Sequence, residues 1–385
     1  MLQFPIYLDN NSTTPVDERV LESMLPFFTK YFGNAASHSH SFGWQAEEAV
    51  DIAREQVAQL INAEPNEIVF TSGATESDNL ALKGVFESYS SKGNHIITVK
   101  TEHKAVLDSC KHLEKLGAEI TYLNVDADGL IDLKELEKSI SSGTILISVM
   151  YANNETGVIQ PIKEISNLAK NKGVLFFTDA TQAVGKIPVN VIKDGIDLMA
   201  FSAHKMYGPK GIGALYVGRK NPRVRITAQM DGGGHEKGMR SGTLNVPGIV
   251  GFGKACELCK VQMKQDEEKT SKLRDKLEKE LLKIDGTRIN GSRIERLPNT
   301  TNMSFKNVDS TDLMMKLSKN IALSSGSACT SATQSPSFVL KALGLTDEMA
   351  FSSLRFGLGR FTTEDEIDFT IQQFQHLLSS KNLQS

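Results

Sequence analysis

The sequence has few cysteines and no long apolar run. Four cysteines (Cys110, Cys256, Cys259 and Cys329) in 385 residues do not form a disulfide framework and fit a reducing compartment. No apolar run approaches the roughly 20 residues that a membrane-spanning helix needs. The first residues, MLQFPIYLDNN, lack the basic flank and long apolar region of a secretory signal. We therefore expect a cytoplasmic protein with no membrane partner.

The sequence also lacks an excess of either positive or negative charge. The chain has 43 basic and 46 acidic residues, a formal charge of -3, and no long block of like charge. This balance argues against nucleic acid as a partner. Hydrophobic residues make up 40% of the chain and charged residues 23%, as in soluble globular proteins. A length of 385 residues exceeds one ordinary core and predicts two domains.

Short apolar runs alternate with helical segments between about residues 65 and 220. Several runs are apolar throughout, as strands are when helices cover both faces of a parallel sheet. The runs are EIVFTS, HIITVK, EITYLNV, TILISVMYA, VLFFTDA, DLMAFSA and IGALYVG. The pattern predicts an α/β fold with a mainly parallel central sheet. Ligands of such sheets bind at the carboxyl ends of the strands.

A long helix after Pro247 is predicted to connect the large domain to a smaller one. The large α/β domain is expected over residues 15–258. The smaller α+β domain is expected over residues 1–14 and 259–385, and contains TTNMSF, a helix from about residue 310, and SSLRFGLGRF with a closing helix.

Cys256 and Cys259 form a C-x-x-C within this long helix, about one turn apart. No second C-x-x-C or H-x-H lies nearby in the sequence. Structural helix positions are therefore favoured over a zinc or redox site, and no metal site is predicted.

Two strand-ending residues carry the strongest chemical signal. Lys205 follows DLMAFSA in a tight Gly-Pro-Gly setting that can desolvate an amine, which lowers its pKa and lets it form a Schiff base. Taken alone, such a lysine is more often a solvated surface charge. Asp179 ends VLFFTDA and is either an N-cap or an anion that needs a cationic partner. A Schiff-base lysine with such an aspartate is the pairing that pyridoxal phosphate requires.

Turns after other strands add polar groups. In FTSGATESDNLAL, Gly73 permits a tight turn before a helix that begins near Thr75, where N–H groups and hydroxyls suit a phosphate, although ordinary capping explains the pattern equally. TVKTEHKAV ends a strand with His103, which either lies beside a planar ligand or is a buried, satisfied histidine. MYANNETGVIQP ends another strand with Asn153 and Asn154, which either orient a ligand oxygen or stabilise the turn.

Motifs spread from about residue 5 to 372 are specific when taken together. They are YLDNNSTTP, TSGATESDNLALKG, TEHKAVLDSC, ANNETGVIQP, DATQAVGK, SAHKMYGPKG, RSGTLNVPGIVG, GSACTSA and SSLRFGLGRFTTEDEID. In this order they resemble those of the NifS/IscS-type cysteine desulfurases. These are class-V aminotransferase-like transferases of fold type I, which use pyridoxal 5'-phosphate.

The resemblance implies a role for each matching residue around the cofactor. Lys205 would form the Schiff base and move the proton at the substrate Cα, while Asp179 would pair with the pyridine nitrogen. Gln182 would contact the phenolic oxygen. His103 would stack on the ring and help to deprotonate the substrate thiol. The residues implied for the phosphate are Thr75, Ser202 and His204, and Ala74 is implied as a further cofactor contact.

The resemblance also implies contacts to the substrate and to a second subunit. Arg355 and Asn154, the latter also a cofactor contact, would hold the carboxylate of L-cysteine, for which a guanidinium fork is well suited. Thr243 would reach the phosphate of the neighbouring subunit's cofactor, which implies a homodimer.

Cys329 lies among small residues in SSGSACTSA, residues 324–332. From the residues alone this is either a small-residue turn or a reactive thiol on a moving loop. The resemblance makes Cys329 the nucleophile, whose thiolate attacks the sulfur of L-cysteine to leave L-alanine and a persulfide on Cys329. We therefore expect weak or multiple conformations for this loop.

Two other functions are alternatives to a cysteine desulfurase. A related enzyme, such as a selenocysteine lyase or a small-amino-acid aminotransferase, is disfavoured because transamination needs no thiol in GSACTSA. A non-catalytic sulfur-relay or scaffold partner is disfavoured by the joint presence of Lys205, Asp179 and His103. The sulfur acceptor stays open between an iron–sulfur cluster assembly scaffold, tRNA thiolation and cofactor biosynthesis. The closing FQHLLSSKNLQS is shorter than the tails with which some family members engage a scaffold.

Overall fold

The computed structural model describes residues 2–220, 223–325 and 335–379. The segment that carries Cys329, and with it the prediction of a loop with several conformations, lies outside the described residues. Within the described residues, every helix is too short or too polar to cross a bilayer.

A seven-stranded sheet forms the centre of the large domain. Its strand order is β2-β8-β7-β6-β5-β3-β4, and every pair is parallel except those that β8 makes with β2 and β7. The strands are β2 (Ile68–Thr71), β3 (His95–Val99), β4 (Glu119–Leu123), β5 (Thr144–Ser148), β6 (Leu175–Asp179), β7 (Leu198–Ser202) and β8 (Gly213–Val217). All the predicted runs are therefore strands of one sheet, and the α/β prediction is confirmed.

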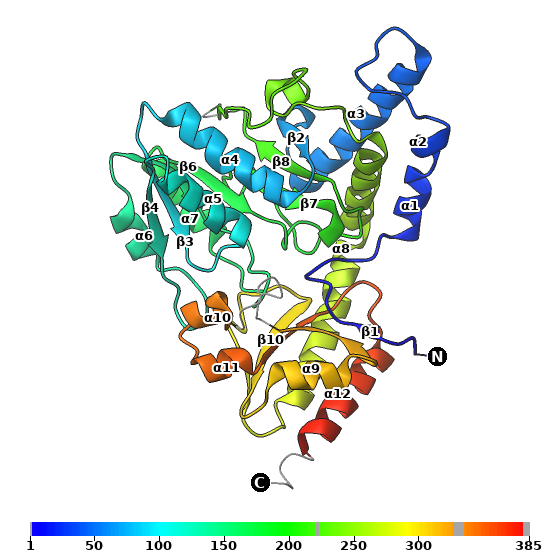
Figure 1. Ribbon diagram of the computed structural model, residues 1–385, viewed down its shortest axis with the longest axis vertical. Helices are drawn as coiled ribbons and strands as arrows, with labels where there is room; N and C mark the ends of the chain where they lie inside the picture. The colour runs from blue at the N-terminus through cyan, green and yellow to red at the C-terminus, as the bar shows by residue number, and fades with distance from the viewer. Residues whose placement is uncertain (1, 221–222, 326–334, 380–385) are drawn as a thin grey trace.

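Helices cover both faces of this sheet (Figure 1). One face packs against α4 (Ala74–Tyr89) and α5 (Lys104–Glu114). The other face packs against α3 (Ser41–Ile61), α6 (Leu133–Ser139), α7 (Ile162–Asn171) and the first half of α8. Successive side chains of a strand point to opposite faces, so burial of both faces explains why the runs are apolar throughout.

The long helix α8 (Val246–Leu281) joins two hydrophobic cores. Its first half contributes Phe252 and Cys256 to the large-domain core, and its second half contributes Leu273 and Leu277 to the core of the small domain. Figure 1 shows α8 running from one domain into the other. The predicted connecting helix is confirmed. The domain division at residues 258 and 259 falls inside it and stays a prediction.

The small domain contains a four-stranded sheet in the order β12-β13-β10-β9. Its strands are β9 (Thr287–Ile289), β10 (Thr300–Phe305), β12 (Ser324–Ser325) and β13 (Ser353–Gly357). Helices α9 (Ser310–Leu317) and α12 (Glu364–Ser379) pack on this sheet, as expected from the helical segments near residue 310 and at the end of the chain. The remaining short helices are α1 (Glu18–Met24), α2 (Pro26–Thr29), α10 (Phe338–Ala342) and α11 (Asp347–Phe351).

The N-terminal segment begins in the small domain and crosses to the large one. Strand β1 (Ile6–Tyr7) pairs in parallel with β11 (Ile321–Ala322). Further along, the backbone N–H of Thr14 donates to the carbonyl of His204, at 2.9 Å. The residues between these two anchors are consequently held next to the end of β7, where the site forms.

Both cysteines of the C-x-x-C are fully buried on α8. Burial raises the pKa of the Cys259 thiol to about 11, which keeps it protonated at neutral pH. A protonated, enclosed thiol is a poor metal ligand, so the packing supports the structural role predicted for Cys256 and Cys259.

Candidate active site

A cavity of about 630 Å³ opens where several strands of the central sheet end. Its volume is in the range of small-molecule sites. Ten of the predicted site residues line this central cavity: Ala74, Thr75, His103, Asn154, Asp179, Gln182, Ser202, His204, Lys205 and Arg355. Thr243 is exposed and does not line it, and Cys329 lies outside the described residues.

Lys205 ends the short 3-10 turn Ala203–Lys205 that follows β7, and backbone carbonyls hold its amine. Its Nζ donates to the carbonyls of Asn11 and Ser12, both at 2.6 Å. Burial and the nearby positive charge of Arg355 lower the pKa of Lys205 to about 8, against the attraction of nearby carboxylates. The neutral amine, which is the form that attacks an aldehyde, is therefore more populated near neutral pH than in an ordinary lysine.

The N-terminus of α4 faces the central cavity. The helix begins at Ala74, and its N-cap, Gly73, has φ +154° and makes no side-chain cap hydrogen bond. The N–H groups of the first turn, at the positive end of the helix dipole, are thus open to an anion. His204, opposite, is neutral because burial and the charges of Lys205 and Lys210 lower its pKa to about 4.

Asp179 ends β6 with only 6% of its surface exposed. One carboxylate oxygen accepts from the N–H of Thr181 at 2.9 Å, as an N-cap would. The residue also lines the central cavity, so its capping contact is compatible with the predicted role as an anion that faces a cationic partner. Gln182 follows in the next turn, and its Nε2 donates to the carbonyl of Asn11 at 2.9 Å.

His103 is exposed rather than buried, which contradicts the alternative of a satisfied core histidine. It caps α5, and its Nδ1 accepts from the N–H of Ala105 at 3.2 Å, which fixes the ring at the edge of the central cavity. Because β3 ends at Val99, the ring lies on the turn that follows the strand and not at the strand end.

The prediction that Asn153 and Asn154 end a strand is wrong, since β5 ends at Ser148. Asn153 stabilises the turn: its Nδ2 donates to the carbonyl of Thr101 at 3.0 Å, and its Oδ1 accepts from the N–H of Thr156 at 2.9 Å. Asn154 lines the central cavity. The turn-stabilising alternative is confirmed for Asn153, and the ligand-orienting alternative stays a prediction for Asn154.

Arg355 reaches the central cavity from β13 of the small domain. Its Nη2 donates to the carboxylate of Asp9 and to the hydroxyl of Ser12, both at 2.7 Å, and its Nη1 donates to the carbonyl of Asn154 at 3.0 Å. Within the described residues its buried Nε has no hydrogen-bond partner. These contacts use three of the five guanidinium N–H donors, which leaves one N–H on Nη1 for a carboxylate besides the buried Nε.

Comparison with known families decides the relationship. The model of the family described as Aminotransferase class-V matches residues 6–369. The chain belongs to the class-V aminotransferase family. Class-V aminotransferases are known as pyridoxal phosphate enzymes.

Relatives within the class-V aminotransferases match nearly the whole chain. "Cysteine desulfurase IscS" of Proteus mirabilis (strain HI4320) is 58% identical over 374 residues, which are 97% of this chain and 92% of the relative. The protein of the same name from Anaeromyxobacter sp. (strain Fw109-5) is 57% identical over 372 residues, 96% of this chain and 92% of the relative.

Solved structures show the same class-V aminotransferase fold. A "NifS-like protein" superposes with a TM-score of 0.91 at 40% identity, over 98% of this chain and 100% of that chain. "SspA in complex with cysteine" superposes with a TM-score of 0.82 at 37% identity, over 93% of this chain and 100% of that chain.

The structure adds wall residues to which no role was assigned from the sequence. Asn11, Ser12 and Thr13 line the central cavity, as do Lys210 and Gly211. The signal for the first three was the polar run between β1 and Pro15 in YLDNNSTTP, a motif of the class-V resemblance. Only the tertiary fold brings that run beside Lys205.

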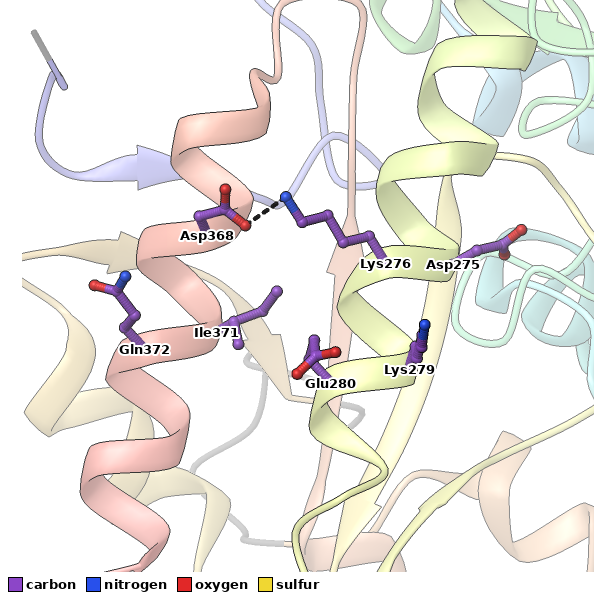
Figure 2. Close-up of a pocket in the computed structure, with 7 residues that line it drawn as sticks. All are labelled: Asp275, Lys276, Lys279, Glu280, Asp368, Ile371 and Gln372. Carbon is purple, nitrogen blue, oxygen red and sulfur yellow. Dashed lines mark ion pairs between the residues drawn. The ribbon is translucent and has the colours of Figure 1, made fainter.

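A second cavity of about 610 Å³ lies between α8 and α12 of the small domain (Figure 2). Its lining is mainly charged, and Lys276 forms an ion pair with Asp368 at 2.6 Å. Such paired surface charges are weakly stabilising, and the seven lining residues include neither a thiol nor a histidine. The chemistry of a class-V enzyme is therefore assigned to the central cavity.

Proposed function

We propose that this protein is a cysteine desulfurase, which converts L-cysteine to L-alanine and holds the released sulfur as a persulfide on Cys329. The observation that carries the proposal is a largely buried Lys205 with a pKa of about 8 in the same cavity as Asp179 and Arg355. The high identity to proteins named cysteine desulfurase IscS, and the likeness to SspA, which was solved in complex with cysteine, support this substrate.

Pyridoxal 5'-phosphate fits the donors of the central cavity. The open N-terminus of α4, with Ala74, Thr75, Ser202 and His204 in the same wall, suits the phosphate. The Asp179 carboxylate suits a protonated ring nitrogen, and a Gln182 amide N–H suits the phenolic oxygen. When bound, the cofactor supplies an aldehyde that an amine can capture and an electron sink for the carbon attached to that amine.

The residues of this chain then divide the work on L-cysteine. Arg355 and Asn154 orient the substrate carboxylate. Lys205 removes the Cα proton, and His103 accepts the proton of the substrate thiol. The Cys329 thiolate attacks the substrate sulfur: an S–S bond forms and the C–S bond breaks. The electron pair of that bond stays on the carbon skeleton, which takes up one proton at Cβ and regains one at Cα from Lys205 to become L-alanine.

Replacing the proposed nucleophile separates cofactor binding from sulfur transfer. We expect Cys329→Ser to keep the visible absorption band of the bound cofactor but to release no sulfide from L-cysteine in the presence of a thiol reductant. Lys205→Ala, the converse control, should lose the borohydride-sensitive band and stall turnover. Undiminished sulfide release by Cys329→Ser would contradict the persulfide mechanism.

We propose that the working form is a homodimer. Four aromatic side chains near the N-terminus, Phe28, Phe32, Phe42 and Trp44, are between 46% and 63% exposed. Phe32 and Phe42 pack on each other, with ring centroids 5.2 Å apart. An aromatic surface of this kind is costly to leave in water. An exposed Thr243, available to a neighbouring subunit's phosphate, supports a second copy as its partner.

The double variant Phe32→Ser/Phe42→Ser tests this association. We expect it to raise the dimer dissociation constant by about 10-fold or more, because two buried aromatic side chains are lost from the interface. Sedimentation equilibrium measures the constant, and Leu116→Ser, an exposed apolar residue just after the end of α5, is the matched control. A wild-type protein that sediments as a monomer at micromolar concentration would refute the dimer.

We propose that the persulfide passes to a protein acceptor in the cytoplasm, such as an iron–sulfur scaffold. The balanced charge of the chain, -3 overall, supports a protein acceptor over direct binding of nucleic acid. Capture of proteins that become persulfidated in the presence of L-cysteine and wild-type enzyme, but not Cys329→Ser, identifies the acceptor.

A further inference from the structure

Lys186 lies one helical turn beyond Gln182 and reaches back to it. Its Nζ donates to Oε1 of Gln182 at 2.6 Å. The Nε2 of the same amide donates to the carbonyl of Asn11 at 2.9 Å, and that carbonyl also accepts from Lys205 at 2.6 Å. A continuous chain of hydrogen bonds therefore joins Lys186, outside the central cavity, to Lys205 inside it.

These two contacts determine which way the Gln182 amide faces. A backbone carbonyl can only accept, so Nε2 must point to Asn11. Because Nε2 is directed to Asn11, the other amide atom, Oε1, faces Lys186 and accepts from its amine. One N–H of the amide then has no partner among these contacts, and Gln182 lines the central cavity. Rotation of the amide by half a turn would place Oε1 against the Asn11 carbonyl and Nε2 against the Lys186 amine. Both hydrogen bonds would then be lost.

The surroundings of Lys186 confine it to this contact. It borders a crevice of only about 20 Å³ between the two domains, together with Tyr207 and Arg360. Burial, followed by repulsion from Lys205 and Arg355, lowers the pKa of Lys186 to about 7. Burying an amine costs free energy. The short hydrogen bond to Gln182 offsets part of this cost, which indicates that the contact is the role of Lys186.

We propose that Lys186 is a positioning residue, which locks the Gln182 amide so that an N–H donor faces the bound cofactor. This inference rests on the proposed function, since the acceptor is an oxygen of the cofactor ring. Loss of Lys186 leaves Gln182 in place with only the Asn11 carbonyl to fix its amide, so the rotated amide becomes less unfavourable. The oxygen would then confront the ring oxygen, which disfavours the anionic form of the ring.

The test is a spectroscopic double-variant cycle on cofactor-loaded protein. We expect Lys186→Met to shift the pH midpoint of the cofactor's visible band by about half a unit or more, in the same direction as Gln182→Ala. Cofactor affinity should fall by about 3- to 10-fold in each variant. The double variant should equal Gln182→Ala alone, because residues that act through one contact are not additive.

Controls separate positioning from packing. Lys186→Arg, which retains a donor, should restore part of the shift, and Lys193→Met, an exposed lysine nearby, should behave as wild type. Lys186→Ala, which also removes the donor, replaces Lys186→Met should the latter not fold. An unchanged midpoint in Lys186→Met, or shifts that add in the double variant, would overturn the role of Lys186. A wild-type protein that takes up no cofactor would instead overturn the proposed function.

Discussion

At the scale of single residues, the site depends on amines moved out of water. Lys205 and Lys186 share one hydrogen-bond chain, and their pKa values, about 8 and about 7, lie below the usual 10.5 mainly because both are buried. Each loses solvation of its charged form, and Arg355 adds repulsion to both. The fold thus prepares a nucleophilic amine near neutral pH.

The pH dependence of the reaction between Lys205 and the cofactor should report the pKa of Lys205 directly. The rate at which cofactor-free protein forms the visible band should rise with a midpoint near pH 8, since the neutral amine reacts. Arg355→Met should move the midpoint upward, because it removes a charge that lowers the Lys205 pKa. Arg293→Met, outside the cavity, is the control. Stopped-flow absorbance measures the rate, and a midpoint near pH 10.5 would contradict the shift.

At the scale of elements, the N-terminus of α4, where we propose that the phosphate binds, depends on close contact between β8 and the turn before this helix. An ideal Cβ on Gly213 would lie 2.7 Å from the Cα of Gly73 and 2.7 Å from the carbonyl oxygen of Phe201. Both neighbours are backbone, which cannot move aside without shifting β7 or the start of α4. Only glycine at position 213 lets the three segments meet.

Gly213→Ala should therefore disturb both the sheet and the N-terminus of α4. We expect the free energy of unfolding to fall by about 1–3 kcal/mol, as in other overpacked sites, and cofactor affinity to fall with it. Gly143→Ala is the control, since the nearest atom to its new Cβ is Ser141 Oγ at 3.8 Å. Urea denaturation and cofactor titration measure the two effects. Wild-type affinity in Gly213→Ala would show that the N-terminus of α4 tolerates the shift.

At the scale of the whole molecule, Arg360 joins the two domains. Arg360 follows β13, the last strand of the small-domain sheet. Its guanidinium donates to Asp17 at 3.1 Å and to Asp266 of α8 at 2.8 Å. Its guanidinium carbon lies 4.2 Å from the ring centroid of Tyr207, two residues after Lys205. One buried cation thus connects the N-terminal segment, the turn that carries Lys205 and the long helix α8.

Arg360→Met should leave the Asp17 carboxylate with less compensation and lower the free energy of unfolding by about 3–5 kcal/mol. Hydrogen bonds from Arg19 and a further one from Arg360 lower the pKa of Asp17 to about 2, against its burial. Its stabilising effect is therefore complete above about pH 4 and is lost as pH falls toward 2.

The free energy of unfolding of Arg360→Met should fall less steeply than that of the wild type as the pH drops from 4 toward 2. Guanidinium denaturation at pH 7, 4 and 3 measures it, with Arg288→Met, an exposed arginine of β9, as the control. An unchanged free energy of unfolding at pH 7 would show that the domains are held by other contacts.

The sequence was sufficient for features set by local pattern. The seven strands could be read from their apolar runs because burial of both sheet faces demands apolar residues at every position. Lys205 and Asp179 stood out because each directly follows such a run, and strand ends of a parallel sheet share one edge. The buried C-x-x-C followed from helical spacing alone.

Long-range contacts were decided only by the tertiary structure. Asn11 and Ser12 are far from Lys205 in the chain, and β1 pairing with β11 is what brings their carbonyls to its amine. The turn-stabilising contacts of Asn153, and the role inferred for Lys186, depend on which partner lies opposite each polar atom. Hydrogen bonds are directional and short, so a pattern of residue types places a polar group near the site, whereas the packed fold selects its partner.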